Sequence, residues 1–134
     1  MGDWNTRIIE EFRANGGKVA AFSWATLLLL TTTGAKSGKP HTTPIIYLSD
    51  EDRLIISATA NGAPTHPAWY HNLLAQPKAT VEVGDVRREM TAVITMGEER
   101  ERLWGKTVAR YPSFADYQRK TPRQIPVIVL QPLS

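Results

Sequence analysis

The sequence predicts an α+β domain, mainly β, built on an antiparallel β-barrel of about six strands with short peripheral helices. Three observations carry this prediction. Short apolar or alternating segments recur between turn residues and are mostly joined by short connections, which is typical of antiparallel strands. Strands and long helices do not alternate, which disfavours a doubly wound parallel sheet. The 134 residues suit one domain, 1–134, and 42% of them are hydrophobic, enough for one core.

An amphipathic helix is predicted first, within residues 1–16. One face of segment 3–15 carries large apolar side chains, which are Trp4, Ile8, Ile9 and Phe12. Gly16 and Gly17 follow and end the helix. We expect this face to pack on the domain; a lid over a site and a peripheral membrane contact are the alternatives.

Three strands are predicted next, over residues 26–33, 41–48 and 53–59. The first is an apolar run that ends in threonines, and a turn at 50–52 joins the second to the third. Pro44 lies inside the second strand and favours an edge position or a bulge there, because proline donates no backbone hydrogen bond.

The second half of the chain is predicted to mix helices and strands. Pro67 precedes a short helix at 68–75, and Gly97 opens a longer helix that runs to about residue 110. The remaining predicted elements are strands at 78–83, 86–96 and 125–130 and a short helical piece at 111–118.

Composition excludes several classes of function. The chain has no cysteine, which rules out disulfides and thiolate metal sites and suits a reducing cytoplasm. His41, His66 and His71 lack metal-ligand spacing, so we expect no metal. No Gly-x-Ser-x-Gly elbow supplies a nucleophile. The net charge of +3 favours an anionic ligand or an acidic membrane surface, without the dense basic patch of a nucleic-acid binder. No apolar run is long enough to span a bilayer.

The segment 31–41 predicts an anion-binding loop. It combines Gly34 and Gly38 with Lys36, Ser37 and Lys39, so backbone N–H groups, a hydroxyl and ammonium groups can converge on one anion. The spacing is not that of a Walker A loop, and a strand follows instead of a helix. A hairpin turn with two solvated lysines is the alternative.

Aromatic residues suggest a pocket for a flat ligand. Trp69 and Tyr70 follow a loop of small residues, and Tyr111, Phe114 and Tyr117 recur every three residues. Rings of this kind stack on a flat ligand while a phenol hydrogen-bonds a carbonyl. Ordinary core or surface aromatics are the alternative.

Several segments together resemble the deazaflavin-dependent nitroreductase family of actinobacteria. They are 31–43 (TTTGAKSGKPHTT), 44–48 (PIIYL), 62–74 (GAPTHPAWYHNLL), 76–83 (QPKATVEV) and 111–117 (YPSFADY). These enzymes use coenzyme F420, an 8-hydroxy-5-deazaflavin whose reduced form is F420H2. The resemblance implies a split β-barrel related to the flavin reductases and pyridoxamine-phosphate oxidases.

The resemblance also implies roles for particular residues. The coenzyme's phosphate and acidic tail would be held by Lys36, Ser37, Gly38, Lys39 and His41. The rest of the coenzyme would lie against Thr43, Pro44, Ala58, Thr59, Ala60, Pro67, Trp69 and Tyr70. The acceptor would face Trp69, Tyr111, Phe114 and Tyr117, with Tyr111 or Tyr117 as the catalytic residue that helps to place a proton.

The activity implied is hydride transfer from F420H2 to a quinone, an α,β-unsaturated lactone or ester of coumarin or aflatoxin type, or a nitroaromatic. An FMN-dependent oxidoreductase on the same fold and a non-catalytic deazaflavin carrier are the alternatives. His41 stands where arginine is common, Ala60 where lysine is frequent and Phe114 where some members have tyrosine, so we expect a more apolar pocket. A small-molecule acceptor, a homodimer and peripheral contact with the inner face of the plasma membrane complete the expectations.

Overall fold

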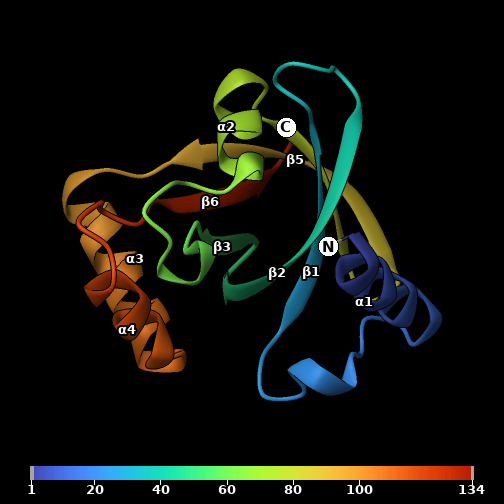
Figure 1. The fold of residues 1–134 in the computed structure, drawn as a ribbon, viewed down its shortest axis with the longest axis horizontal. Coiled ribbons are helices and arrows are strands. Elements are labelled where there is room, and N and C mark those ends of the chain that lie inside the picture. Colours follow the sequence, from blue (N-terminus) through green and yellow to red (C-terminus); the bar gives the residue numbers. More distant parts are fainter. Residues whose placement is uncertain (1, 134) are drawn as a thin grey trace.

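Six antiparallel strands close into a barrel in the computed structural model, which describes residues 2–133 apart from the side chain of Asp3 (Figure 1). The order around the barrel is β1-β2-β3-β6-β5-β4, so β1 meets β4 to close it. The strands are β1 (Leu27–Thr33), β2 (Pro40–Asp50), β3 (Arg53–Ser57), β4 (Lys78–Val83), β5 (Val86–Ile94) and β6 (Val127–Pro132). The predicted barrel is confirmed.

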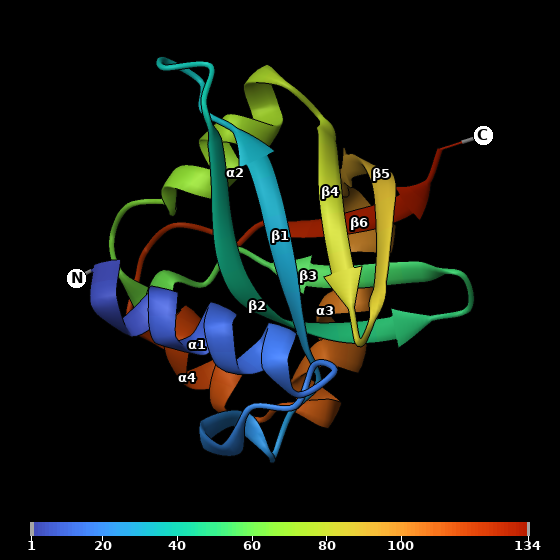
Figure 2. The same ribbon diagram turned by 90° about the vertical axis from the view of Figure 1, so that its right-hand side faces the viewer.

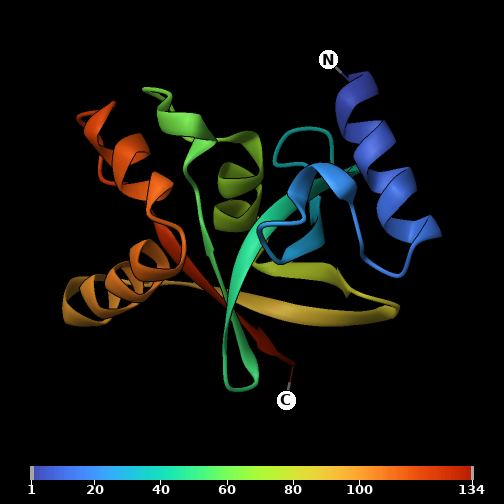
Figure 3. The same ribbon diagram turned by 90° about the horizontal axis from the view of Figure 1, so that it is seen from below.

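Helices surround the barrel on different sides. They are α1 (Gly2–Ala14), α2 (Ala68–Ala75), α3 (Gly97–Arg110) and α4 (Ser113–Arg119), with short 3-10 turns η1 (Ala20–Phe22) and η2 (Ala60–Gly62). Figure 2 shows α1 lying across β1 and β2, and Figure 3 shows α3 and α4 on the side opposite to α1. Within residues 2–133, no helix has the length and apolar character needed to cross a bilayer.

The leucine run of β1 is apolar on both faces because both faces are covered. Side chains alternate along a strand, so Leu28 and Leu30 fill the barrel interior while Leu27 and Leu29 face outward. The outward pair packs against Ile8 and Phe12 of α1 in a cluster that Val19 completes. The expected packing face of the N-terminal helix is confirmed for Ile8, Ile9 and Phe12, whereas Trp4 remains exposed.

Pro44 lies where β2 has a partner on one side only. Residues 40–46 of β2 pair with β1, and Pro44 stands opposite Leu29. Pairing of β2 with β3 starts at Tyr47 and continues to Asp50. At Pro44 the strand β2 therefore has a free edge on the side of β3, where no backbone hydrogen bond is lost by the missing N–H. The expected edge position is confirmed.

Some predicted strand ends are wrong by a few residues. The strand predicted to reach Thr59 ends at Ser57, because the chain turns through η2 with Ala60 at a φ of 46° and Asn61 at 55°. The last strand begins at Val127 instead of Ile125, whose backbone N–H and C=O bind the side chains of Gln118 and Arg100.

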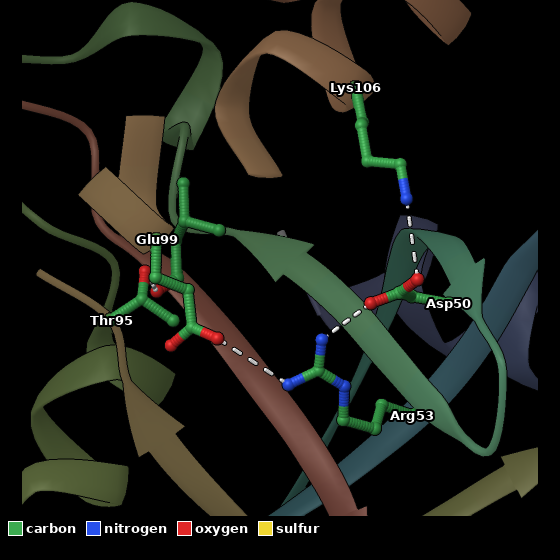
Figure 4. A network of polar contacts seen from close by, with 6 residues as sticks. Asp50, Arg53, Thr95, Glu99 and Lys106 are labelled. Atoms are coloured by element: carbon green, nitrogen blue, oxygen red, sulfur yellow. Dashed lines mark hydrogen bonds and ion pairs between the residues drawn. The ribbon is translucent and has the colours of Figure 1, made fainter. Parts of the chain in front are cut away.

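A polar network fixes the far end of the β2–β3 hairpin to α3. Arg53 contacts Asp50 at 2.5 Å and Glu99 at 3.6 Å, and Lys106 contacts Asp50 at 3.3 Å (Figure 4). The hydrogen bonds that Arg53 and Lys106 donate to Asp50 hold the pKa of its carboxyl below the usual range, and the bond from Arg53 is the larger cause. The network anchors the hairpin and takes no part in the cavity described below.

Candidate active site

A cavity of about 480 Å³ opens between η2, α2, α4 and the part of β2 that pairs with β1 but not with β3. Most residues predicted for the ring of the coenzyme and for the acceptor line it, namely Thr43, Pro44, Thr59, Ala60, Pro67, Trp69, Phe114 and Tyr117. The first turns of α1 complete the wall with Trp4, Asn5 and Ile8. Trp4 and Trp24 remain more than half exposed at its edge, at 57% and 51%. The lining is largely apolar and aromatic, which suits a flat ligand.

A second and larger cavity, of about 740 Å³, lies beneath the segment that joins α1 to β1. It shares Phe22 and Leu27 with the first cavity but contains none of the predicted site residues. Volume alone does not identify a site, so we place the candidate active site in the smaller cavity, where polar groups and aromatic rings converge.

One buried polar atom in the wall of the smaller cavity has no partner. Ser57 is 7% exposed, and its Oγ makes no hydrogen bond to any residue of 2–133. A buried hydroxyl without a partner costs free energy, so such a group in a cavity wall is suited to a polar atom of a ligand. Sequence reasoning missed Ser57, because a serine at the end of an apolar strand carries no distinguishing pattern.

The predicted anion-binding loop joins β1 to β2 and is held by its own hydrogen bonds. The N–H of Gly34 donates to the carbonyl of Lys39 at 2.8 Å, and the N–H of Gly38 donates to the carbonyl of Gly34 at 2.9 Å. A Cβ on Gly34 would lie 2.5 Å from Ser37 Oγ, and Gly38 has a φ of +71°. The two glycines therefore permit the tight shape of the loop.

Four donors of this loop are open to an anion. Lys36 and Lys39 are exposed, and the described residues supply no ion pair to either side chain. The backbone N–H groups of Lys36 and Ser37 likewise have no acceptor in this part of the chain. Two ammonium groups and two amides suit a phosphate. Exposed His41 lies next to the loop, with Nε2 3.5 Å from Ser37 Oγ.

Asn72 fixes the loop to α2 and was missed by sequence reasoning. Its buried Oδ1 accepts the N–H of Ala35 at 2.9 Å, and its Nδ2 donates to Thr32 Oγ1 at 3.0 Å. Trp69, one turn earlier on the same helix face, lines the cavity. One face of α2 therefore positions both the loop and the cavity wall.

Arg123 is the third residue that sequence reasoning missed. Its guanidinium donates to the carbonyls of Ala58, Thr59 and Ala63 at 3.1, 2.8 and 2.9 Å. It also lies 2.9 Å from Nδ1 of His66. Because arginine has only donors, that nitrogen of His66 must accept. The residues around Arg123, 121–126 (TPRQIP), form no pattern that predicts contacts with residues so distant in the sequence.

Burial lowers the pKa of the His66 imidazole, and the nearby positive charges of Arg123 and His71 lower it further. Burial also lowers the pKa of the Arg123 guanidinium. The lowered pKa of His66 agrees with the hydrogen-bond geometry, in which a neutral histidine accepts from the arginine. His66 therefore has a structural partner and does not lie in the cavity lining.

The predicted aromatic group divides into two parts. Phe114 and Tyr117 of α4 line the cavity, whereas Tyr111 is 3% exposed and lies outside the lining. The Tyr111 hydroxyl accepts the N–H of Thr26 at 3.0 Å and is 3.1 Å from the carbonyl of Tyr47, to which it donates. Trp24 packs edge-on against the Tyr111 ring, with centroids 6.0 Å apart. Tyr111 thus holds the segment that carries Trp24.

Two further predicted residues lie behind the cavity wall. Ala58 is fully buried, and its carbonyl is one of the acceptors of Arg123. Tyr70 is partly buried and its ring is tilted against that of His66, with centroids 4.7 Å apart. Neither residue is part of the cavity lining.

The residues present fit a ligand with a flat ring and an anionic chain. The loop with the open donors begins at one end of β2, and Thr43 and Pro44 of the same strand line the cavity, about 10 Å further along. Ser57, whose buried hydroxyl has no partner among residues 2–133, belongs to the same cavity lining. A deazaflavin that carries a phosphodiester has a flat ring at one end, which suits the cavity, and negative charge further along, which suits the loop.

The sequence pattern of a protein family described as F420H(2)-dependent quinone reductase matches residues 4–132. The F420H(2)-dependent quinone reductase Rv1261c of Mycobacterium tuberculosis is 41% identical over 106 residues, covering 77% of this chain and 71% of that protein. A solved F420-H2 dependent reductase (FDR-A) is 42% identical, with a TM-score of 0.72 and coverage of 78% and 93%. A structure described as a domain-swapped dimer is 36% identical, with a TM-score of 0.74 and coverage of 97% and 98%.

More distant structures share the fold alone. HutZ, the haem storage protein of Vibrio cholerae, has a TM-score of 0.62 at 14% identity and covers 94% of this chain and 88% of its own. A Listeria innocua chain assigned to the pyridoxamine 5′-phosphate oxidases has a TM-score of 0.56 at 16% identity. The split-barrel prediction is therefore confirmed.

Proposed function

The chain belongs to the family of F420H2-dependent quinone reductases, a group of oxidoreductases, and from that premise we propose how its residues divide the work. The 34–39 loop binds the phosphate and the start of the acidic tail of F420. The cavity binds the deazaflavin ring together with the acceptor. A bound F420H2 supplies a hydride, so the chain itself needs no nucleophile or metal.

The acceptor we propose is a flat quinone, or another electrophilic ring of the enone or nitroaromatic type. The observation that carries this proposal is the apolar wall of Pro44, Trp69 and Phe114 beside the orphaned Ser57 hydroxyl. Such a wall stacks a flat ring and excludes water, while a single hydroxyl orients a ring oxygen. Tyr117 in the same wall is the phenol placed to help deliver a proton to the reduced acceptor.

Two expectations about partners extend this proposal. The domain-swapped relative supports a homodimer for this chain as well. The exposed Trp4 and Trp24 at the edge of the cavity support peripheral contact with a membrane from which a quinone could enter. A cytoplasmic location at the inner face of the plasma membrane would agree with both.

An anaerobic fluorescence titration with oxidised F420, with FMN in parallel, tests the coenzyme. Tight binding of F420 with weak binding of FMN supports the proposal, and preference for FMN would move the chain to flavin chemistry on the same barrel. Oxidation of F420H2 by menadione, an enone or a nitroaromatic then tests the acceptor. Tight F420 binding without turnover on any of the three would indicate a carrier.

A further inference from the structure

The Arg123 guanidinium lies behind the cavity and holds a loop of unusual backbone conformation. Its hydrogen bonds go to Ala58, Thr59, Ala63 and His66, and the described part of the chain places no carboxylate against it. Between those contacts, Ala60 and Asn61 have positive φ values of 46° and 55°. A non-glycine residue in this region costs about 1 kcal/mol or more, so the surrounding contacts must maintain the conformation.

The contact with Thr59 determines where the next amide points. The N–H and C=O of a trans peptide are antiparallel, and the described chain has no cis peptide. Because the Thr59 carbonyl faces Arg123 at 2.8 Å, the N–H of Ala60 faces away from the guanidinium. Ala60 lines the cavity, and no residue of 2–133 accepts its N–H or that of Asn61. Arg123 thus turns one free donor, the Ala60 N–H, to the opposite side of the loop.

The same segment also holds the opposite wall. The Gln118 side chain of α4 donates to the Arg123 carbonyl at 2.7 Å and accepts the Ile125 N–H at 2.9 Å. Helix α4 contacts η2 so closely that a Cβ on Gly62 would lie 2.9 Å from the Tyr117 carbonyl. Arg123 is therefore connected to η2 through its side chain and to α4 through its backbone.

We propose that Arg123 is a positioning residue that sets the separation of the two cavity walls and aims the Ala60 amide at the edge of a bound ring. The part that concerns the ring rests on the proposed function, in which the ring is the deazaflavin. A guanidinium suits this task because its rigid fork reaches several carbonyls at once, which the single ammonium of lysine does not. Its unpaired positive charge also favours an electron-rich ring edge.

The test compares Arg123→Gln and Arg123→Lys with Arg119→Gln as a matched control. Arg119 is exposed near the end of α4 and pairs only with Asp116 among the described residues. The first readout is the backbone 1H–15N spectrum of the protein without coenzyme. The second is the affinity for oxidised F420, measured by fluorescence titration. Thermal unfolding establishes that each variant is folded.

Both Arg123 variants should shift the backbone amide signals of Ala60 and Asn61, and should weaken F420 binding by about tenfold or more. Lysine should rescue little, although it keeps the charge. The Arg119 control should leave both readouts unchanged. Folded Arg123 variants with unchanged amide signals and F420 affinity within about twofold would overturn the proposal.

Two further outcomes are informative. If both Arg123 variants unfold, the residue supports the whole fold, and the specific positioning role is overturned. If the wild-type protein binds no F420, the proposed function fails by itself, while the amide signals still decide whether Arg123 holds the loop.

Discussion

Two loops of this protein are each held by one polar side chain from a distant segment of the chain. The 34–39 loop is fixed by the buried Asn72 of α2, and the 58–66 loop is fixed by Arg123. The first loop presents exposed lysines, whereas the second presents backbone at positive φ. In the proposed function, the first loop would recognise charge through exposed side chains, while the second would position a ring through a fixed backbone.

Replacing the anchor of the first loop should have the largest effect. Asn72→Leu keeps the size of the side chain but leaves the Ala35 N–H and the Thr32 hydroxyl without their partner. We expect the free energy of unfolding to fall by about 2–4 kcal/mol, measured by urea denaturation, and F420 affinity to fall with it. His71→Leu on the exposed face of α2 is the control. An unchanged urea midpoint would show that Asn72 does not anchor the loop.

Removing a charge from the first loop should affect binding without affecting stability. Lys36→Ala should weaken F420 binding by about 1.5–3 kcal/mol, because a charge-assisted contact with phosphate is lost. The side chain is exposed, so the urea midpoint should stay within error. Arg102→Ala, an exposed charge on α3, is the control for net charge. Equal affinities for the two variants would contradict a specific role for the loop.

The Tyr111 hydroxyl provides a smaller test, near the other end of the cavity. Tyr111→Phe removes the contacts with Thr26 and Tyr47 and should lower the free energy of unfolding by about 1–2 kcal/mol. Turnover should fall because Trp24 loses its support, while F420 affinity stays nearly intact. Tyr117→Phe is the control for stability. Should it cost as much stability as Tyr111→Phe, the assigned anchoring role would be wrong.

The smallest effect should come from the protonation of His66. Burial and the charges of Arg123 and His71 hold its folded-state pKa below the ordinary value of 6.5, and the ring of Tyr70 packs against it. The unfolded chain therefore binds the proton more readily, so stability is complete above about pH 6.5 and declines as the pH falls below it. Urea midpoints should show a steeper acid decline for wild type than for His66→Gln. Exposed His41→Gln should follow the wild type, and identical slopes for all three would refute the prediction.

Much of the fold was predictable from local patterns. The helix at 68–75 and the strand at 78–83 were predicted with the bounds that the structure shows, because proline residues and alternation mark them. The tight loop at 34–39 was also evident, since its glycines mark a turn, and its anion binding remains a prediction from the lysines and serine in the same segment. The family resemblance identified eight of the eighteen residues that line the cavity.

Tertiary structure alone decided which polar groups hold the site together. Asn72 acts on residues about 40 positions away in the chain, and Arg123 acts on residues about 60 positions away. It also separated Tyr111 from Phe114 and Tyr117, which share one spacing in the sequence but differ in surroundings. The physical reason is that periodicity and composition report a residue's local preference, whereas a hydrogen bond between distant segments exists only once the barrel has closed and excluded water.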